Sequence, residues 1–150
     1  MNIPDIRSLV PHAGPMVLLD RVISADEESL CAEITIRSDS LFCTTEGVGA
    51  WVGLEYMAQA IGAYAGFIAY LRGEAVKIGF LLGTRRFECN RPFFSVGTHL
   101  QIHVKRVFQS ANGMGSFECR IEDGGDQLAS ATLTVYQPAD DAQSPDETSP

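Results

Sequence analysis

The sequence predicts an α+β fold in which a curled antiparallel sheet wraps around one long central helix. A mostly apolar stretch, residues 51–71, has the sequence WVGLEYMAQAIGAYAGFIAYL and is long enough for about five turns of helix. Runs of alternating apolar and polar residues follow it as far as residue 136, separated by turns rich in glycine. A helix that is apolar on nearly all sides needs cover, so the sheet must curl around it or a second subunit must contact it.

The residues before this helix predict a short entry helix and a hairpin. In chain order we expect a helix (Ile3–Val10), a turn (11–15), a strand (Met16–Ile23), a turn (24–29), a strand (Leu30–Arg37) and an irregular segment (39–49). Along the second strand polar positions alternate with apolar ones, which predicts one face in water: Cys31, Glu33, Thr35 and Arg37.

The residues after the helix predict a meander of strands. Arg72-Gly73 supplies a basic last turn and a glycine cap to the helix. The expected strands are Val76–Phe87, Gly97–Ser110, Met114–Glu122 and Gln127–Tyr136. Gly79 and Gly83 predict bulges or close approaches in the first of these strands. Residues 1–137 therefore form a single domain, and the acidic tail 138–150 has a composition typical of disorder.

Composition excludes several classes of protein. The chain of 150 residues carries a net charge of −8, part of it in the acidic tail, and this balance argues against nucleic-acid binding. Its four cysteines are widely spaced without a CxxC pair, which predicts reduced thiols rather than a zinc site or disulfides: Cys31, Cys43, Cys89 and Cys119. His99 and His103 lie about 13 Å apart on a predicted strand, too far to share a metal. We expect no metal.

The N-terminal residues do not form a signal peptide, because no basic segment precedes an apolar one, and the expected location is cytoplasmic. Residues 51–71 also match a membrane span in length. However, Glu55 and Gln59 would then lie inside the bilayer without a basic flank on the N-terminal side. A helix buried by its own sheet satisfies the same pattern at lower cost.

Glu55 and Gln59 are the polar side chains of the helix that need an explanation. Burying an ionised carboxylate without a partner costs several kcal/mol, so the fold must pair Glu55, keep it protonated or use it. Gln59 either holds Glu55 or a water molecule in place, or satisfies a buried carbonyl group. Helical spacing places five residues along one stripe: Trp51, Glu55, Gln59, Gly62 and Gly66.

Three motifs, in this order, resemble those of the 3-hydroxyacyl-acyl-carrier-protein dehydratases. Residues 6–12 (IRSLVPH), continuing to 18–22 (LLDRV), are similar to the family's L-P-H turn and D-R-V strand. Residues 54–60 (LEYMAQA) resemble its L-E-x-M-A-Q-A helix, and 86–97 resembles its R-F-x-x-P-V-x-x-G-D segment. The resemblance implies the hotdog fold and a dimer with acyl-thioester tunnels at the subunit interface.

The resemblance also implies a mechanism. Glu55 would handle the leaving hydroxyl group, while a histidine from the other subunit removes the α-proton. In the family that histidine lies fourteen residues before the glutamate, where this chain has Leu41. His12 is the candidate replacement base. The amides of Gly49 and Ala50, just before the helix, are candidates for an oxyanion site.

Further substrate contacts are expected from Gln59, Arg86 and Arg91, the arginines meeting a phosphopantetheine phosphate or an acidic carrier protein. The patterns P-H-x-G-P-M and G-x-E-Y-M-A-Q-A are closest to the second dehydratase-like proteins of aryl-polyene gene clusters, which lack the same histidine. No cofactor is expected beyond the phosphopantetheine that carries the substrate.

Three functions remain open. The chain is a dehydratase for acyl-carrier-protein or CoA thioesters of fatty-acid or polyene biosynthesis, a non-catalytic acyl-binding or stabilising subunit of a dehydratase heterodimer, or a hotdog thioesterase. Whether it forms a homodimer or a heterodimer with a homologous dehydratase also remains open.

Overall fold

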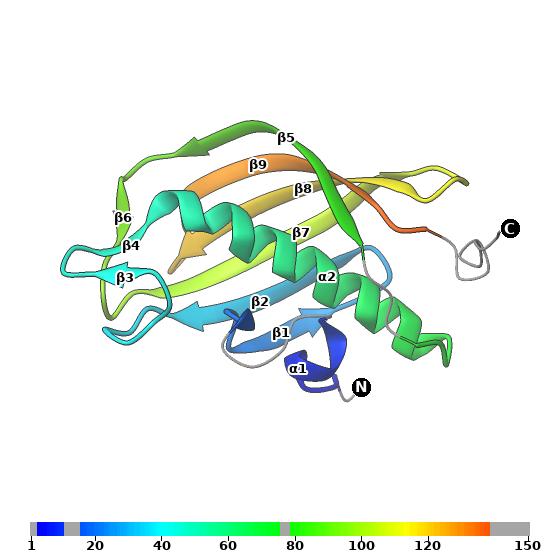
Figure 1. Ribbon diagram of the computed structural model, residues 1–150, viewed down its shortest axis with the longest axis horizontal. Helices are drawn as coiled ribbons and strands as arrows, with labels where there is room; N and C mark the ends of the chain where they lie inside the picture. Colours follow the sequence, from blue (N-terminus) through cyan, green and yellow to red (C-terminus); the bar gives the residue numbers. More distant parts are fainter. Residues whose placement is uncertain (1–2, 11–15, 76–78, 139–150) are drawn as a thin grey trace, which may run out of the picture.

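The computed structural model describes residues 3–10, 16–75 and 79–138. Within them, one six-stranded antiparallel sheet, in the order β1-β2-β7-β8-β9-β5, curls along one side of the long helix α2 (Figure 1). The elements are α1 (Ile6–Leu9), β1 (Arg21–Ala25), β2 (Ser29–Thr35), β3 (Cys43–Thr44), β4 (Gly47–Gly49), a 3-10 turn (Ala50–Val52), α2 (Gly53–Leu71), β5 (Phe80–Cys89), β6 (Phe93–Phe94), β7 (His99–Gln109), β8 (Met114–Asp123) and β9 (Asp126–Tyr136).

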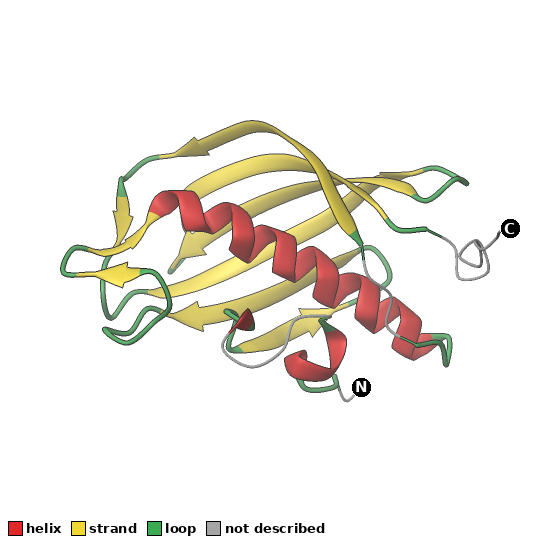
Figure 2. Cartoon of the chain, viewed as in Figure 1, coloured by secondary structure: helices red, strands yellow, loops and turns green. Residues whose placement is uncertain are grey.

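The predicted architecture is confirmed. The helix begins with a 3-10 turn at Ala50 and ends at Leu71, followed by Gly73 with a φ of 68°. A second, small sheet in the order β3-β4-β6 lies at the N-terminal end of α2 and occupies part of the segment predicted to be irregular (Figure 2).

The core lies between the six-stranded sheet and α2. The register of β2 against β7 pairs apolar residues on the same face: Leu30 with Val104, Ala32 with Ile102, and Ile34 with Leu100. These side chains are at most 3% exposed. Met57, Ala60 and Phe67 of α2 are 0% exposed. The apolar alternation predicted for β7 therefore forms one wall of the core, and α2 forms the other.

The N-terminal segment covers the face of α2 that points away from the sheet. At 100° per residue, Gln59 and Gly66 lie nearly opposite to Met57, which points into the core. A Cβ atom on Gly66 would lie 2.1 Å from the carbonyl oxygen of Leu9, so this glycine lets α1 pack directly on α2. The cover predicted to come from the sheet or a second subunit thus comes partly from the chain's own first residues.

Two predictions for the N-terminal hairpin are wrong. The first strand begins at Arg21 rather than Met16, because the carbonyl of Met16 and the amide of Leu18 bond the side chain of Gln59 instead of a neighbouring strand. The outward face of β2 is not all in water. Glu33 is only 6% exposed, because Arg21 and His99 lie across its carboxylate.

Several other expectations can be placed on the structure. β5 is described from Phe80, with register shifts between Leu81 and Gly83 and between Arg85 and Glu88. The turn 11–15 and most of the acidic tail lie outside the described residues. All four cysteines are free.

The described ranges lack two kinds of feature. They hold no group of three or more His, Cys, Asp or Glu residues suited to bind a metal. In the same ranges, no helix is long and apolar enough to cross a membrane.

Candidate active site

Glu55 lies in the first turn of α2, where its side chain is half-buried. The 3-10 turn over Ala50–Val52 continues directly into the helix. The first N–H groups of a helix have no intrahelical acceptor and carry a partial positive charge, which stabilises a nearby carboxylate. The start of α2 is therefore a favourable place for an acidic side chain.

Gln59 positions Glu55 and is itself held by the N-terminal segment. It is 0% exposed. Its Oε1 accepts a hydrogen bond from the amide of Leu18 at 2.9 Å. Its Nε2 donates to the carbonyl of Met16 at 2.7 Å and to Oε2 of Glu55 at 3.1 Å.

The backbone partners fix the orientation of this amide, because only an oxygen can face the Leu18 amide and only the NH₂ group can face the Met16 carbonyl. The NH₂ group must therefore point to Glu55. Gln59 performs both roles that the sequence left open, since it satisfies a part-buried carbonyl and holds the carboxylate.

Of the two amides expected to form an oxyanion site, one has a backbone partner. The amide of Ala50 donates to the carbonyl of Pro92 at 2.9 Å, so it is already used. Gly49 is buried in β4, and a Cβ atom there would lie 2.4 Å from the indole nitrogen of Trp51. The amide of Trp51 comes next, before the first hydrogen bond of the 3-10 turn, and it is a further candidate for binding an oxyanion.

The two predicted substrate-binding arginines lie in different places. Arg91 directly precedes Pro92, whose carbonyl bonds Ala50, so it lies close to the start of α2. It is exposed and donates to the side chain of Asn90 at 3.0 Å. Arg86 has a φ of 57° at a bulge of β5 and lines a depression on the sheet face that points away from α2, together with Lys105 and Glu118. The structure therefore does not bring Arg86 to Glu55. His12 lies outside the described residues.

An exposed aromatic pair beside the start of α2 was not expected from the sequence. The rings of Phe42 and Trp51 lie 5.8 Å apart, and the two residues are 46% and 66% exposed. Leu41, at the position of the family's histidine, is 40% exposed. A group of exposed apolar side chains of this kind marks a contact surface. The signal in the sequence was Leu41, an apolar residue at the position of the family's histidine.

Comparison with known proteins gave consistent matches. The family model for ApeP-like proteins, described as ApeP dehydratase, matches residues 4–146. The 3-hydroxyacyl-acyl-carrier-protein dehydratase FabZ of Bartonella quintana is 27% identical over 141 residues, covering 90% of this chain and 88% of its own length. The FabZ of Thermus thermophilus is 31% identical over 140 residues, covering 89% of this chain and 95% of its own length.

Among solved structures, a chain of the dehydratase heterocomplex ApeI:P from Xenorhabdus doucetiae superposes with a TM-score of 0.84 and 32% identity, covering 93% of this chain and 95% of that one. A hypothetical thioesterase from Streptococcus pneumoniae, solved with coenzyme A, has a TM-score of 0.62 and 13% identity, which shows a shared fold alone. The predicted hotdog fold is confirmed by these matches.

Proposed function

Because this chain belongs to the ApeP-like dehydratase family, we propose that it takes part in the dehydration of 3-hydroxyacyl thioesters and that Glu55 is its reacting group. The observation that carries the proposal is the hydrogen bond from Gln59 to Glu55, which holds one carboxylate oxygen in place at the start of α2. The substrate class is supported by the FabZ relatives, which are named for it.

The proposed reaction is a β-elimination. A base removes the α-proton, the thioester oxygen takes up negative charge, and the bond between Cβ and the hydroxyl oxygen breaks. Glu55 donates its proton to this hydroxyl group, which leaves as water, and recovers a proton from the base at the end of the cycle. The amide of Trp51 stabilises the charged thioester oxygen. No cofactor takes part beyond the phosphopantetheine that carries the acyl group.

The base comes from a partner chain. The position of the family's histidine is Leu41 here, and an alkyl side chain takes no proton. A heterodimer with a homologous dehydratase would supply the histidine to Glu55. The similar structure from Xenorhabdus doucetiae is named as such a heterocomplex and supports this arrangement. In the reverse site, the partner's carboxylate would meet Leu41, so we expect one working site per heterodimer.

The open edge of the sheet suits this partner. β5 ends the six-stranded sheet on one side, with Leu81 and Leu82 exposed at 47% and 55%. An unpaired strand edge with apolar side chains is a template for pairing with another chain. We expect the partner to add its own edge strand there.

The test uses this chain co-purified with a homologous dehydratase and a 3-hydroxyacyl carrier-protein substrate, with the enoyl product measured by mass spectrometry of the carrier. Glu55→Gln should lower the rate about a hundredfold to ten-thousandfold, the usual contribution of a general acid. Glu118→Gln, on an exposed part of β8, is the matched control and should keep the full rate.

The same experiment separates the alternative functions. Full activity of Glu55→Gln in the complex would assign this chain a stabilising, non-catalytic role. This role is the second candidate because Leu41 replaces the family's histidine. Release of the free acid instead of the enoyl thioester would identify a thioesterase.

A further inference from the structure

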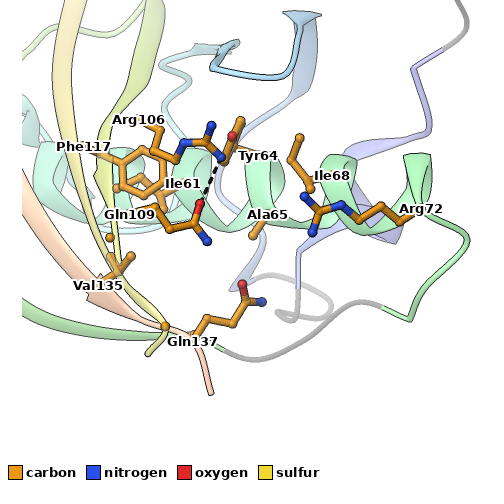
Figure 3. Close-up of a pocket in the computed structure, with 13 residues that line it drawn as sticks. Ile61, Tyr64, Ala65, Ile68, Arg72, Arg106, Gln109, Phe117, Val135 and Gln137 are labelled. Atoms are coloured by element: carbon orange, nitrogen blue, oxygen red, sulfur yellow. Dashed lines mark hydrogen bonds between the residues drawn. The ribbon is translucent and has the colours of Figure 1, made fainter. Parts of the chain in front are cut away.

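A cavity of about 120 Å³ lies toward the other end of α2, between this helix and the ends of β7, β8 and β9 (Figure 3). The helix contributes residues from Ile61 to Arg72 to its lining. With a rise of 1.5 Å per residue, these lie about 9 to 26 Å from Glu55 along the helix axis. Glu55 is not among the lining residues, so the cavity is separate from the candidate active site.

One part of the wall of this cavity is apolar. It is formed mainly by Ile61 and Ile68 from α2, Phe117 from β8 and Val135 from β9. An engineered apolar cavity of about 150 Å³ in another protein binds benzene. The cavity here therefore has room for one aromatic ring or a short alkyl group.

The mouth of the cavity is positively charged. Arg106 lies over the ring of Tyr64, 5.9 Å from its centroid, and donates to Oε1 of Gln109 at 3.0 Å. Arg72, the C-terminal cap of α2, extends its guanidinium group along Ile68 toward the same space (Figure 3). Burial raises the pKa of Tyr64, the charges of Arg106 and Arg72 lower it, and the charge of Asp26 raises it.

The described residues that line the cavity include no acidic side chain. This is unusual in a chain with a net charge of −8. Gln109 and Gln137 add amide groups that can donate hydrogen bonds at the rim. An apolar chamber with two guanidinium groups at its opening suits a ligand with an apolar body and an anionic end, since guanidinium groups bind carboxylates through paired, charge-assisted hydrogen bonds.

We propose that this cavity binds an aromatic ring or short alkyl group whose attached carboxylate, or similar acceptor group, lies between Arg72 and Arg106. Two sources supply this chemistry. One is a small free acid. The other is the far end of the acyl chain being processed, and this second source rests on the function proposed above.

The first experiment measures binding of hydrocinnamate and of hydrocinnamyl alcohol to the purified full chain by isothermal titration calorimetry. The acid should bind at least about tenfold more tightly than the alcohol, because only the acid pairs with a guanidinium group. Arg72→Gln should remove this preference, and its exposed position at the end of α2 keeps the fold intact. Arg120→Gln, an exposed arginine on the outer face of β8, removes the same charge elsewhere and should keep the preference.

Equal binding of acid and alcohol, or an equal loss in Arg72→Gln and Arg120→Gln, would overturn the proposal. A second variant tests the location. Ala65→Phe places a ring in the half-buried lining position and should abolish binding of both compounds. Unchanged binding by this variant would place the ligand elsewhere and also overturn it.

The second experiment distinguishes the two sources without turnover. Pantetheine thioesters whose acyl chains end in a carboxyphenyl group or in a methyl group are titrated against bound hydrocinnamate. Displacement by the carboxyphenyl thioester alone assigns the cavity to the far end of the acyl chain. Displacement by neither thioester assigns it to a free acid. Because binding is measured, a failure of the proposed dehydration would leave this result intact.

Discussion

Nε2 of Gln59 donates a hydrogen bond to Oε2 of Glu55, 3.1 Å away and one turn earlier on α2. The same NH₂ group donates to the carbonyl of Met16, which is 43 residues away in the sequence. The N-terminal segment therefore fixes an amide that in turn fixes the candidate catalytic carboxylate. A change in how this segment packs on α2 will alter the geometry at Glu55 even where no residue near the substrate changes.

Gln59→Leu tests this link. The substitution leaves the part-buried Leu18 amide and Met16 carbonyl without their side-chain partner, and each unsatisfied group costs about 1–3 kcal/mol. The free energy of unfolding in urea should fall by roughly 2–5 kcal/mol. Gln127→Leu, at an exposed position of β9, is the control and should change it by less than about 0.5 kcal/mol.

Gln59 has two roles, which are to bond the N-terminal segment and to position Glu55. Measuring both the unfolding free energy and the dehydration rate separates them. Gln59→Glu keeps an acceptor for Leu18 but loses the donor to Glu55, so the heterodimer should lose dehydration rate even at temperatures where it remains folded. A folded Gln59→Glu complex with the full rate would contradict a positioning role.

Gly66→Ala tests the contact between α1 and α2. Alanine is the better helix former by about 1 kcal/mol, so the substitution would stabilise an uncrowded helix. Here the new Cβ would lie 2.1 Å from the carbonyl oxygen of Leu9 and must push α1 away. We expect a loss of about 1–3 kcal/mol in the free energy of unfolding, measured by denaturant titration. An increase in stability would show that α1 does not pack on α2 as described.

The matched control is Gly83→Ala, where a Cβ atom meets no heavy atom within 4 Å. Its effect should stay within about 0.5 kcal/mol. An equal loss in both variants would point to a general effect of replacing glycine rather than to the contact with Leu9.

The sequence predicted the long helix and the strands after it because their apolar periods are unambiguous. The alternation of Leu100, Ile102 and Val104 is that of a strand with one buried face. The strand expected to begin at Met16 begins at Arg21 instead, and no local sequence pattern indicates this difference. Its backbone groups bond a glutamine that lies far along the chain, and aliphatic composition alone does not reveal that partner.

The candidate site also combines features that the sequence predicted with features that it did not. Glu55 was found because a carboxylate in an apolar helix is an exception to the pattern. Other features of the site depend on contacts between distant segments. These are the hydrogen bond from the Ala50 amide to Pro92, the position of Arg86 on the outer face, and the exposed pair of Phe42 and Trp51. Side-chain type indicated what these residues can do. Only the fold shows where they do it.

His103 predicts a pH dependence of stability. It faces Cys31 on β2 and Arg120 and Glu122 on β8. Burial lowers the pKa of His103 below its usual value of 6.5, the charge of Arg120 lowers it further, and Glu122 opposes both. The folded state therefore favours neutral imidazole. As pH falls through about 6.5, the unfolded chain binds more protons than the folded one, so stability falls.

His103→Gln removes this titration and should flatten the curve of unfolding free energy between about pH 8 and about pH 5.5. Urea titrations of both proteins across this range give the comparison. Parallel curves would mean that His103 titrates alike in the folded and unfolded states.

The position of Leu41 gives the sharpest test of the proposed active site. In a heterodimer, Glu55 of this chain meets the partner's histidine, whereas the partner's carboxylate meets Leu41. Glu55→Gln therefore removes the one working site. Adding Leu41→His to that inactive chain supplies a base to the second site, where the partner's own carboxylate is intact.

The double variant Leu41→His, Glu55→Gln should regain at least about tenfold in dehydration rate over Glu55→Gln alone. Leu41→Gln in the same background is polar but takes no proton and should restore nothing. If the histidine and the glutamine variants behave alike, residue 41 does not face the second site, and the arrangement of the two half-sites proposed above is incorrect.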